Sequence, residues 1–283
     1  MATNSGLQKE FAGVITGASS GIGKALALLL ADKYAARLVI TARTREDLEK
    51  TKLEVEKRGG KCLTICGDIG EDLSITKQIV DTCVREYGGI DLLVNNAGIG
   101  KPGGLTKLTP ADWERVFAVN FFAPLYAVYE VMPHFLQKRR GKIVNVSSVA
   151  SKIAFPGSVC YAASKFALTG LSEGLAAELG PKGIDTITVC PGWVRTEFFE
   201  KNAMSDAKNP TRIAEKNDWK GLVMRNLLST SAQQTAKDIL AALEKGGSRE
   251  IITTIPGVFA ERMKALFPDL TAALTSRTPP DYK

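Results

Sequence analysis

The stretch AGVITGASSGIG occupies residues 12–23 and joins an apolar run to a turn rich in glycine. Residues 12–16 have the short, apolar, β-branched composition of a buried strand, and residues 21–33 have the pattern of a helix. Gly17, Gly21 and Gly23 therefore lie between a first strand and a first helix, with the spacing GxxxGxG and not GxGxxG. Glycines at such a place let the backbone approach a phosphate, and the helix N-terminus offers free N–H groups to the anion. The stretch predicts a phosphate-binding turn at the start of an α/β fold.

Strand and helix patterns alternate along most of the 283 residues. Further strands are expected at 38–41, 61–66, 92–95, 142–146, 186–190 and 250–254, and further helices at 45–58, 74–87, 110–138, 158–179 and 232–243. Seven strands with helices between them predict repeated βαβ units and a parallel sheet covered on both faces. We therefore expect one α/β domain over residues 1–283.

Two segments depart from this alternation. Residues 193–230 are long, mixed in polarity and interrupted by Asn209-Pro210, and they follow the carboxyl end of a predicted strand. Open α/β sheets bind ligands there, so this segment is expected to be a substrate-binding loop or lid. The C-terminal tail, residues 255–283, carries large apolar side chains at near-helical spacing, namely Phe259, Met263, Leu266, Phe267, Leu270 and Leu274. The spacing predicts a helix packed on the core or on a subunit partner, and the alternative is peripheral contact with a membrane or a hydrophobic substrate.

Composition and charge exclude several classes of function. The net charge is +7, but Lys and Arg are scattered, so we expect no nucleic-acid partner. No apolar run approaches the ~20 residues of a membrane span, and the first ten residues lack the apolar region of a secretory signal. The five cysteines match neither a zinc nor a disulfide spacing, which favours a reducing, cytoplasmic compartment. His134 is the only histidine, which excludes Ser-His-Asp chemistry and a histidine-based metal site, so no metal is expected.

Tyr161 and Lys165 are four residues apart in the predicted helix 158–179. Residues at this spacing share a helix face, so the Lys165 ammonium is expected near the Tyr161 phenol, where it favours the phenolate. A phenol with a pKa of ~10 needs such help to act as an acid or base near neutral pH. Together with the glycine-rich turn, the pair suggests a nicotinamide enzyme.

Two residues bear on which nicotinamide cofactor is used. Arg43 follows the second strand, twenty residues after Gly23, where NAD enzymes carry an acid and NADP enzymes tend to carry a base. Arg43 therefore predicts NADP(H), while the nearby Glu46 and Asp47 leave NAD(H) possible. Asp68 follows the third strand and is expected either to accept a hydrogen bond from the adenine amine or to cap the next helix.

Six motifs occur in one order along the chain: TGxxxGIG at 16–23, NNAG at 95–98, Asn120, Ser147-Ser148, Tyr161-x-x-x-Lys165 and Pro191-Gly192. In these motifs the chain resembles the classical short-chain dehydrogenase/reductase family, from its start to about residue 255. The resemblance implies a doubly wound Rossmann-type fold with a seven-stranded parallel sheet. It also implies an oxidoreductase acting on CH–OH groups (EC 1.1.1), assembled as a homodimer or homotetramer.

The resemblance further implies residue roles. Tyr161 would be the general acid/base, Ser148 would hold the substrate oxygen, and Lys165 would bind the nicotinamide ribose and lower the tyrosine pKa. Asn120 would hold a water of a proton relay, and Thr196 would contact the nicotinamide carboxamide or cap the next helix. The implied cofactor contacts are Gly17, Ser19, Ser20, Gly21, Ile22, Gly23, Arg43, Asp68, Asn95, Ala97, Gly98, Tyr161, Lys165, Pro191, Gly192, Val194 and Thr196. NADP-preferring members often carry a second basic residue where this chain has Ser20, so the NADP(H) preference rests on Arg43.

The physical chemistry of carbonyl reduction agrees with these roles. A ketone that gains a hydride develops negative charge on its oxygen, which O–H donors from Tyr161 and Ser148 would stabilise. Ser147 is the competing serine. Segments expected beside the nicotinamide carry Phe155, Trp193, Phe198, Phe199, Met204, Trp219 and Met224, and substrate contacts are expected from Ser148, Phe155, Tyr161, Trp193 and Phe198. These side chains suggest a lipophilic ketone or secondary alcohol, or they anchor the loop to the sheet.

The sequence thus predicts an NADP(H)-dependent oxidoreductase. The alternatives are an NAD(H)-dependent alcohol dehydrogenase of the same family and a cofactor-binding scaffold without catalysis. Such a scaffold would be expected to have lost Tyr161, Lys165 or Ser148, and all three are present.

Overall fold

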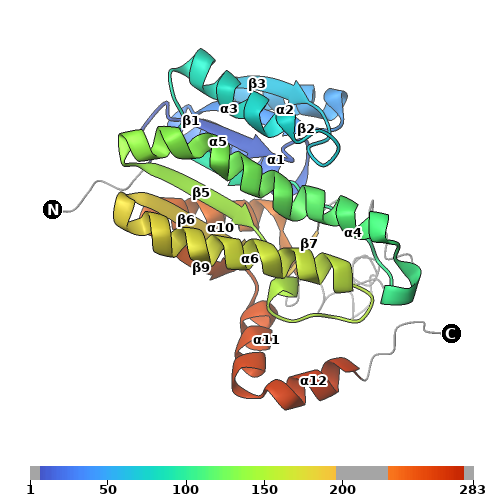
Figure 1. The fold of residues 1–283 in the computed structure, drawn as a ribbon. Coiled ribbons are helices and arrows are strands. Elements are labelled where there is room, and N and C mark those ends of the chain that lie inside the picture. Colours follow the sequence, from blue (N-terminus) through green and yellow to red (C-terminus); the bar gives the residue numbers. More distant parts are fainter. Residues whose placement is uncertain (1–6, 196–228, 277–283) are drawn as a thin grey trace, which may run out of the picture.

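The computed structural model describes residues 7–195 and 229–276 (Figure 1). The strands are β1 (Ala12–Thr16), β2 (Arg37–Ala42), β3 (Lys61–Cys66), β4 (Leu92–Asn95), β5 (Gly141–Val146), β6 (Ile184–Cys190), β7 (Trp193–Arg195), β8 (Ser229–Ser231) and β9 (Arg249–Ile252). The α-helices are α1 (Gly21–Tyr34), α2 (Arg45–Lys57), α3 (Ser74–Tyr87), α4 (Pro110–Phe117), α5 (Ala123–Lys138), α6 (Val159–Leu179), α10 (Ala232–Lys245), α11 (Ile255–Leu266) and α12 (Pro268–Ser276). Short helical turns are η1 (Leu105–Lys107), η2 (Ala118–Phe122), η3 (Val149–Ser151) and η4 (Gly180–Lys182).

Seven strands form one parallel sheet in the order β3-β2-β1-β4-β5-β6-β9. The strand order reverses between β1 and β4, and a crevice opens at the carboxyl ends of strands at such a switch point. The predicted doubly wound, Rossmann-type sheet is confirmed, and every predicted strand is present within two residues of its expected ends.

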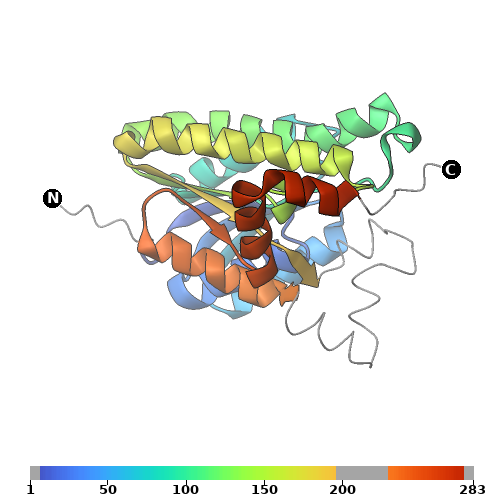
Figure 2. The same cartoon turned by 90° about the horizontal axis from the view of Figure 1, so that it is seen from below.

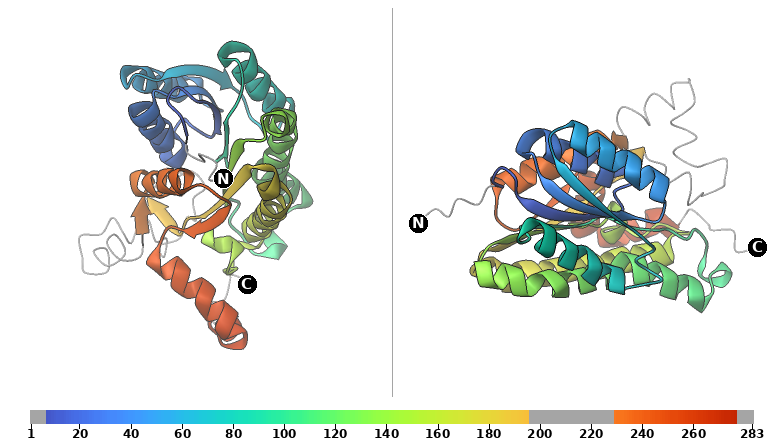
Figure 3. Two further views of the ribbon diagram at one scale, coloured as in Figure 1. Left: turned by 90° about the vertical axis from the view of Figure 1, so that its left-hand side faces the viewer. Right: turned by 90° about the horizontal axis from the view of Figure 1, so that it is seen from above.

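Helices cover both faces of the sheet (Figures 2 and 3). One face packs on α1, α2 and α10, and the other packs on α3, α5 and α6. Successive strand residues supply the two cores, because Ile15 of β1 joins the first and Val14 joins the second. A strand buried on both faces needs the continuous apolar run found in the sequence, and burying each Val or Ile stabilises the fold by about 1.5–3 kcal/mol.

The helix predicted at 110–138 is one continuous helical run with a π turn, η2, in its middle. Thr109 begins it with a capping box, since its hydroxyl accepts from the Asp112 N–H at 3.3 Å. Among the described residues this run of 29 residues is the single helix long and apolar enough to cross a membrane. Its apolar composition has another explanation here, because side chains such as Val131 and Phe135 are fully buried against α3 and the sheet.

The tail forms two helices, α11 and α12, that project from the carboxyl end of the sheet (Figure 1). The last strand ends at Ile252, before its predicted end at 254, because the Thr254 hydroxyl caps α11 by accepting from the Gly257 N–H at 3.3 Å. The first turn of α11 packs tightly, since a Cβ at Gly257 would lie 2.6 Å from the Val149 side chain. Five of the apolar tail side chains are half or more exposed: Phe259, Leu266, Phe267, Leu270 and Leu274. The predicted helical structure is present, but these side chains do not pack on the chain's own core, and packing on a subunit partner stays a prediction.

The two ends of the predicted loop at 193–230 lie side by side. Its first residues form β7 and its last form β8, and these strands pair in parallel with Trp193 opposite Ser229. The predicted contacts at Thr196, Phe198, Phe199, Met204, Trp219 and Met224 lie outside the described residues.

Candidate active site

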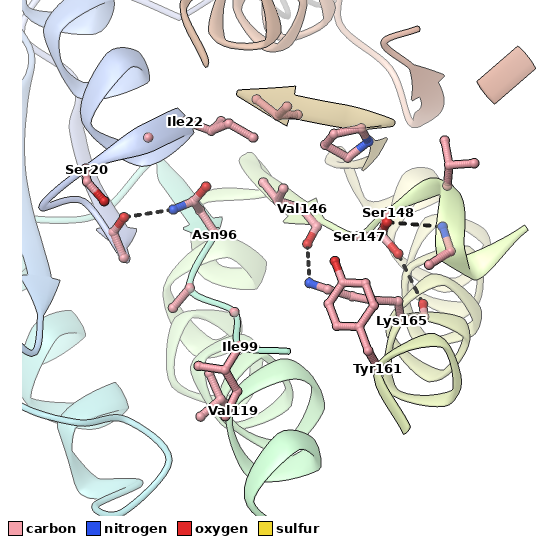
Figure 4. Close-up of a pocket in the computed structure, with 18 of the residues that line it drawn as sticks. Ser20, Ile22, Asn96, Ile99, Val119, Val146, Ser147, Ser148, Tyr161 and Lys165 are labelled. Atoms are coloured by element: carbon pink, nitrogen blue, oxygen red, sulfur yellow. Dashed lines mark hydrogen bonds between the residues drawn. The ribbon is translucent and has the colours of Figure 1, made fainter. Parts of the chain in front are cut away.

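A cavity of about 690 Å³ opens at the carboxyl ends of the central strands (Figure 4). Its wall is built from the glycine-rich turn, the ends of β2 to β6, the first turns of α6 and α11, and one side of α4 and η2. The cavity lies at the switch point of the sheet, which is where the fold predicts a ligand.

The glycine-rich turn leaves no room for a side chain at Gly17 or Gly23. Gly17 has φ +66, and a Cβ there would lie 2.8 Å from the Ala97 Cα. A Cβ at Gly23 would lie 2.5 Å from the Asn96 Nδ2. The Asn96 amide donates to the carbonyls of Thr16 at 2.9 Å and Gly17 at 3.0 Å, so it ties the end of β4 to the turn.

The first turn of α1 is available to an anion. Ser20 caps α1 without a side-chain hydrogen bond, and the first turn carries no acidic residue. Free N–H groups beside glycines that admit close approach form a cradle for a pyrophosphate, so the residues present fit a dinucleotide. Ser19, Ser20, Gly21 and Ile22 all line the cavity beside this turn.

Two guanidinium groups meet one carboxylate at the far end of the cavity. Asp68 accepts from the Gly70 N–H at 2.9 Å and from Arg115 of α4, and Arg43 lies 3.9 Å from the same carboxylate. Burial acts to raise the pKa of Asp68, but these two hydrogen bonds and both positive charges outweigh it and hold that pKa below its ordinary value. Asp68 thus shapes the turn at 68–72, and it does not cap α3, whose N-cap is Leu73.

Tyr161 and Lys165 project from α6 into the cavity, one turn apart (Figure 4). Lys165 is 3% exposed, its Nζ donates to the Val146 carbonyl at 2.8 Å, and the same atom lies 5.8 Å from the centre of the Tyr161 ring. Burial lowers the pKa of Lys165 to about 8. Burial also raises the pKa of Tyr161 to about 12, although its hydrogen bond with Ser148 acts in the opposite direction. In the chain alone the phenol is therefore neutral at pH 7, which differs from the prediction that Lys165 already favours the phenolate.

The two adjacent serines have different partners. The Ser148 hydroxyl accepts from the Ala150 N–H at 3.1 Å and bonds to the Tyr161 phenol. The Ser147 hydroxyl donates to the Lys165 carbonyl at 3.1 Å and lies 2.8 Å from the Thr169 hydroxyl. The structure therefore brings Ser148 to the tyrosine and uses Ser147 to hold α6 against β5.

Comparison with known proteins agrees with this geometry. The family model described as short chain dehydrogenase matches residues 12–208. The chain belongs to the short-chain dehydrogenase family. It is 37% identical over 188 residues to a 3-oxoacyl-[acyl-carrier-protein] reductase from Thermotoga maritima, covering 66% of this chain and 76% of that protein. It is 35% identical over 188 residues to a gluconate 5-dehydrogenase from Gluconobacter oxydans, covering 66% and 73%. The structure of a candidate short-chain alcohol dehydrogenase from Sinorhizobium meliloti superposes with a TM-score of 0.75 at 25% identity, over 91% of this chain and 99% of that one.

Membership sets the general activity of the chain. Short-chain dehydrogenases are oxidoreductases that act on CH–OH or carbonyl groups, bind small-molecule substrates and use nicotinamide cofactors. The predicted family resemblance is confirmed.

Three described residues predicted for this short-chain dehydrogenase site do not line the cavity. Asn95 is buried and its amide donates to the Asn145 side chain at 2.9 Å, because alternation along β4 turns it away from the cofactor side. Asn120 is fully buried in η2, accepting from the Ile99 N–H at 2.9 Å and donating to the Ser164 hydroxyl at 2.9 Å. Gly23 packs against the Asn96 side chain and the Gly17 backbone. The remaining described candidates line the cavity, including Ala97, Gly98, Phe155, Pro191, Gly192, Trp193 and Val194.

The structure adds residues that the sequence reasoning missed. Arg115 reaches the cavity from α4, and no local pattern marks it because its partner Asp68 is 47 residues away. Thr254, Pro256, Gly257 and Ala260 line the cavity from α11. A signal for this second group was present, since Thr254-Ile255-Pro256 is a helix start directly after the last strand, at the carboxyl edge of the sheet.

Proposed function

We propose that this short-chain dehydrogenase is an NADP(H)-dependent enzyme that interconverts a lipophilic ketone and its secondary alcohol. The observation that carries the proposal is the hydroxyl pair of Tyr161 and Ser148 in the cavity, with the buried Lys165 one turn along α6. Two O–H donors at one point suit a carbonyl oxygen that is gaining negative charge.

The cofactor would lie along the carboxyl edge of the sheet. The turn at 16–23 would hold the pyrophosphate, Asp68 the adenine amine, and Lys165 the nicotinamide ribose. Arg43 lines the cavity with a side chain that is 62% exposed, and it would bind the 2′-phosphate that distinguishes NADP(H) from NAD(H). When bound, the nicotinamide supplies or accepts the hydride.

The proton is handled by Tyr161. Because the pKa of Tyr161 is raised to about 12, the phenol carries its proton at neutral pH and can donate it to the oxygen of a ketone being reduced. Ser148 donates to the same oxygen and holds it in place. In the reverse direction the phenolate is needed, and the Lys165 ammonium 5.8 Å from the ring centre favours it. The bonds of the Asn120 side chain to Ile99 and Ser164 support a positioning role for that residue.

The apolar lining of the cavity favours a lipophilic substrate. Phe155, Trp193, Pro256 and Ala260 line the cavity together with the catalytic pair, and Phe155 is 44% exposed. The relatives do not set the substrate, since one is named for an acyl-carrier reduction and another for oxidation of gluconate. The predicted contacts of Thr196 and Phe198 lie outside the described residues.

We also propose that the enzyme is a homodimer or homotetramer. Phe122, Tyr126 and Tyr129 are exposed along η2 and α5, at 42%, 42% and 65%. A row of aromatic side chains on one long helix is suited to a subunit contact. Light scattering on the purified chain is expected to give two or four times the mass of one chain, and a monomer would contradict the proposal.

The function is tested with a panel of lipophilic and polar ketones and alcohols, followed at 340 nm with NADPH and with NADH. We expect reduction of lipophilic ketones, with a higher kcat/KM for NADPH. Tyr161→Phe serves as the blank for background oxidation of the cofactor. Binding of NADPH with no turnover of any compound would favour the scaffold, and a preference for NADH would overturn the role of Arg43.

A further inference from the structure

We propose that Arg115 is a specificity-determining residue for the cofactor: it neutralises Asp68 and thereby leaves Arg43 free for a 2′-phosphate. This inference rests on the proposed NADP(H) function and adds to it a residue of α4. Asp68, Arg43 and Arg115 all line that cavity.

The two guanidinium groups compete for one oxygen of Asp68. Arg115 Nη2 donates to the Asp68 Oδ2, and Arg43 Nη1 lies 3.9 Å from the same atom. The other carboxylate oxygen of Asp68 is already used, because it accepts from the Gly70 N–H at 2.9 Å. Arg115 therefore occupies the position that Arg43 would otherwise take.

The surroundings enclose Arg115 more than Arg43. The Arg115 side chain is 30% exposed and that of Arg43 is 62% exposed. A Cβ at Gly70 would clash with the Arg115 guanidinium, so this guanidinium is seated on the turn that follows Asp68. Its Nη1 is buried and has no hydrogen-bond partner among the described residues, so Asp68 is the group that holds it. Arg115 donates directly to the carboxylate, whereas Arg43 lies 3.9 Å from it and is more exposed, and this difference separates the roles of the two arginines.

The charge balance gives the consequence. Two guanidiniums and one carboxylate leave one net positive charge at this end of the cavity, and that charge is on Arg43. Without Arg115, the exposed side chain of Arg43 would pair with Asp68 and the net charge would be zero. A 2′-phosphate would then lose its partner, whereas a 2′-hydroxyl would be little affected.

The test is a charge series read by cofactor binding. Dissociation constants of NADPH and NADH are measured by fluorescence titration of the full chain, and the quantity compared is the NADH constant divided by the NADPH constant. The variants are Asp68→Asn, Arg115→Met and the double variant, which leave net charges of two, zero and one. We expect the ratio to be highest in Asp68→Asn, similar in wild type and double variant, and lowest in Arg115→Met. Each step of one charge is expected to change this ratio about tenfold, which corresponds to ~1.4 kcal/mol.

Lys101→Met is the matched control. Lys101 pairs at 3.2 Å with Asp112, which lies on α4 as Arg115 does. Lys101 is not among the residues that line the cavity. Removing this charge is expected to leave the ratio unchanged. Asn at position 68 keeps an oxygen that can accept from the Gly70 N–H, so the turn is preserved.

The possible outcomes separate the inference from the proposed function. A wild type that binds NADPH no more tightly than NADH would overturn the proposed preference, and the inference with it. A wild type that prefers NADPH while Arg115→Met keeps the same ratio would overturn the inference alone. If Asp68→Asn does not return the ratio of the Arg115→Met variant to the wild-type value, Arg115 acts through packing. That result would also overturn the inference. If Arg115→Met does not fold, a drop of about tenfold from Asp68→Asn to the double variant supports the inference, and equal ratios overturn it.

Discussion

Replacing Lys165 with Met is expected to abolish turnover without destabilising the protein at neutral pH. Lys165 is 3% exposed, and burial lowers its pKa from 10.5 to about 8. Each unit of pKa corresponds to about 1.4 kcal/mol, so holding the charged amine in this site costs about 3 kcal/mol. The variant loses the hydrogen bond to the Val146 carbonyl, which is expected to cost about 1–3 kcal/mol. The free energy of unfolding at pH 7 should therefore stay the same or rise by up to about 2 kcal/mol.

The dependence on pH gives the sharper test. Because the folded-state pKa of Lys165 is lower than the unfolded value, the destabilising effect is fully present below pH 8 and disappears as the pH rises toward 10.5. The stability of the wild type should therefore approach or exceed that of Lys165→Met across this window. The change in the difference between the two proteins is expected to be about 3 kcal/mol.

The measurement is urea unfolding of both proteins at several values between pH 7 and 10.5. Taking the difference at each pH removes the other titrations, which the two proteins share. Lys182→Met serves as the control, because Lys182 is exposed in η4 and its charge is solvated in both states. A difference between Lys165→Met and wild type that stays flat over this range would refute the argument that burial penalises the Lys165 charge. Turnover is expected to fall as well, since the same amine would bind the ribose and favour the phenolate.

Four further substitutions test the site. Tyr161→Phe is expected to lower kcat by ~10²–10⁴-fold and to leave the NADPH dissociation constant nearly unchanged, and activity above about a tenth of wild type would contradict its acid role. Ser148→Ala is expected to lower kcat by ~10²-fold, whereas Ser147→Ala should mainly lower the free energy of unfolding, by about 1–3 kcal/mol, and the reverse pattern would reassign the serines. Arg43→Asp is expected to shift the ratio of kcat/KM from NADPH toward NADH, and an unchanged ratio would exclude contact with the 2′-phosphate.

Local sequence determined the elements of this protein and the motifs they carry. Strand β1 and helix α1 follow from an apolar run and a 3.6-residue pattern with glycines between them, all within residues 12–34. Tyr161 and Lys165 share a face because they are one helical turn apart, which is a property of any helix. Repeated βαβ units predicted a parallel sheet covered on both faces, and the family resemblance implied the doubly wound order that places a crevice between β1 and β4.

Tertiary structure decided which side chains meet in the cavity. Asp68 and Arg115 pair across 47 residues, and neither has a local pattern that names the other. The neighbours that a side chain meets at a strand end depend on how the elements pack, so Asn95 meets Asn145 in the core, and Ser148, not Ser147, meets Tyr161. The pKa of Tyr161 is also a tertiary property, because burial raises it and outweighs the hydrogen bond with Ser148, which lowers it. Periodicity acts over a few residues, whereas contact and desolvation depend on how whole elements pack.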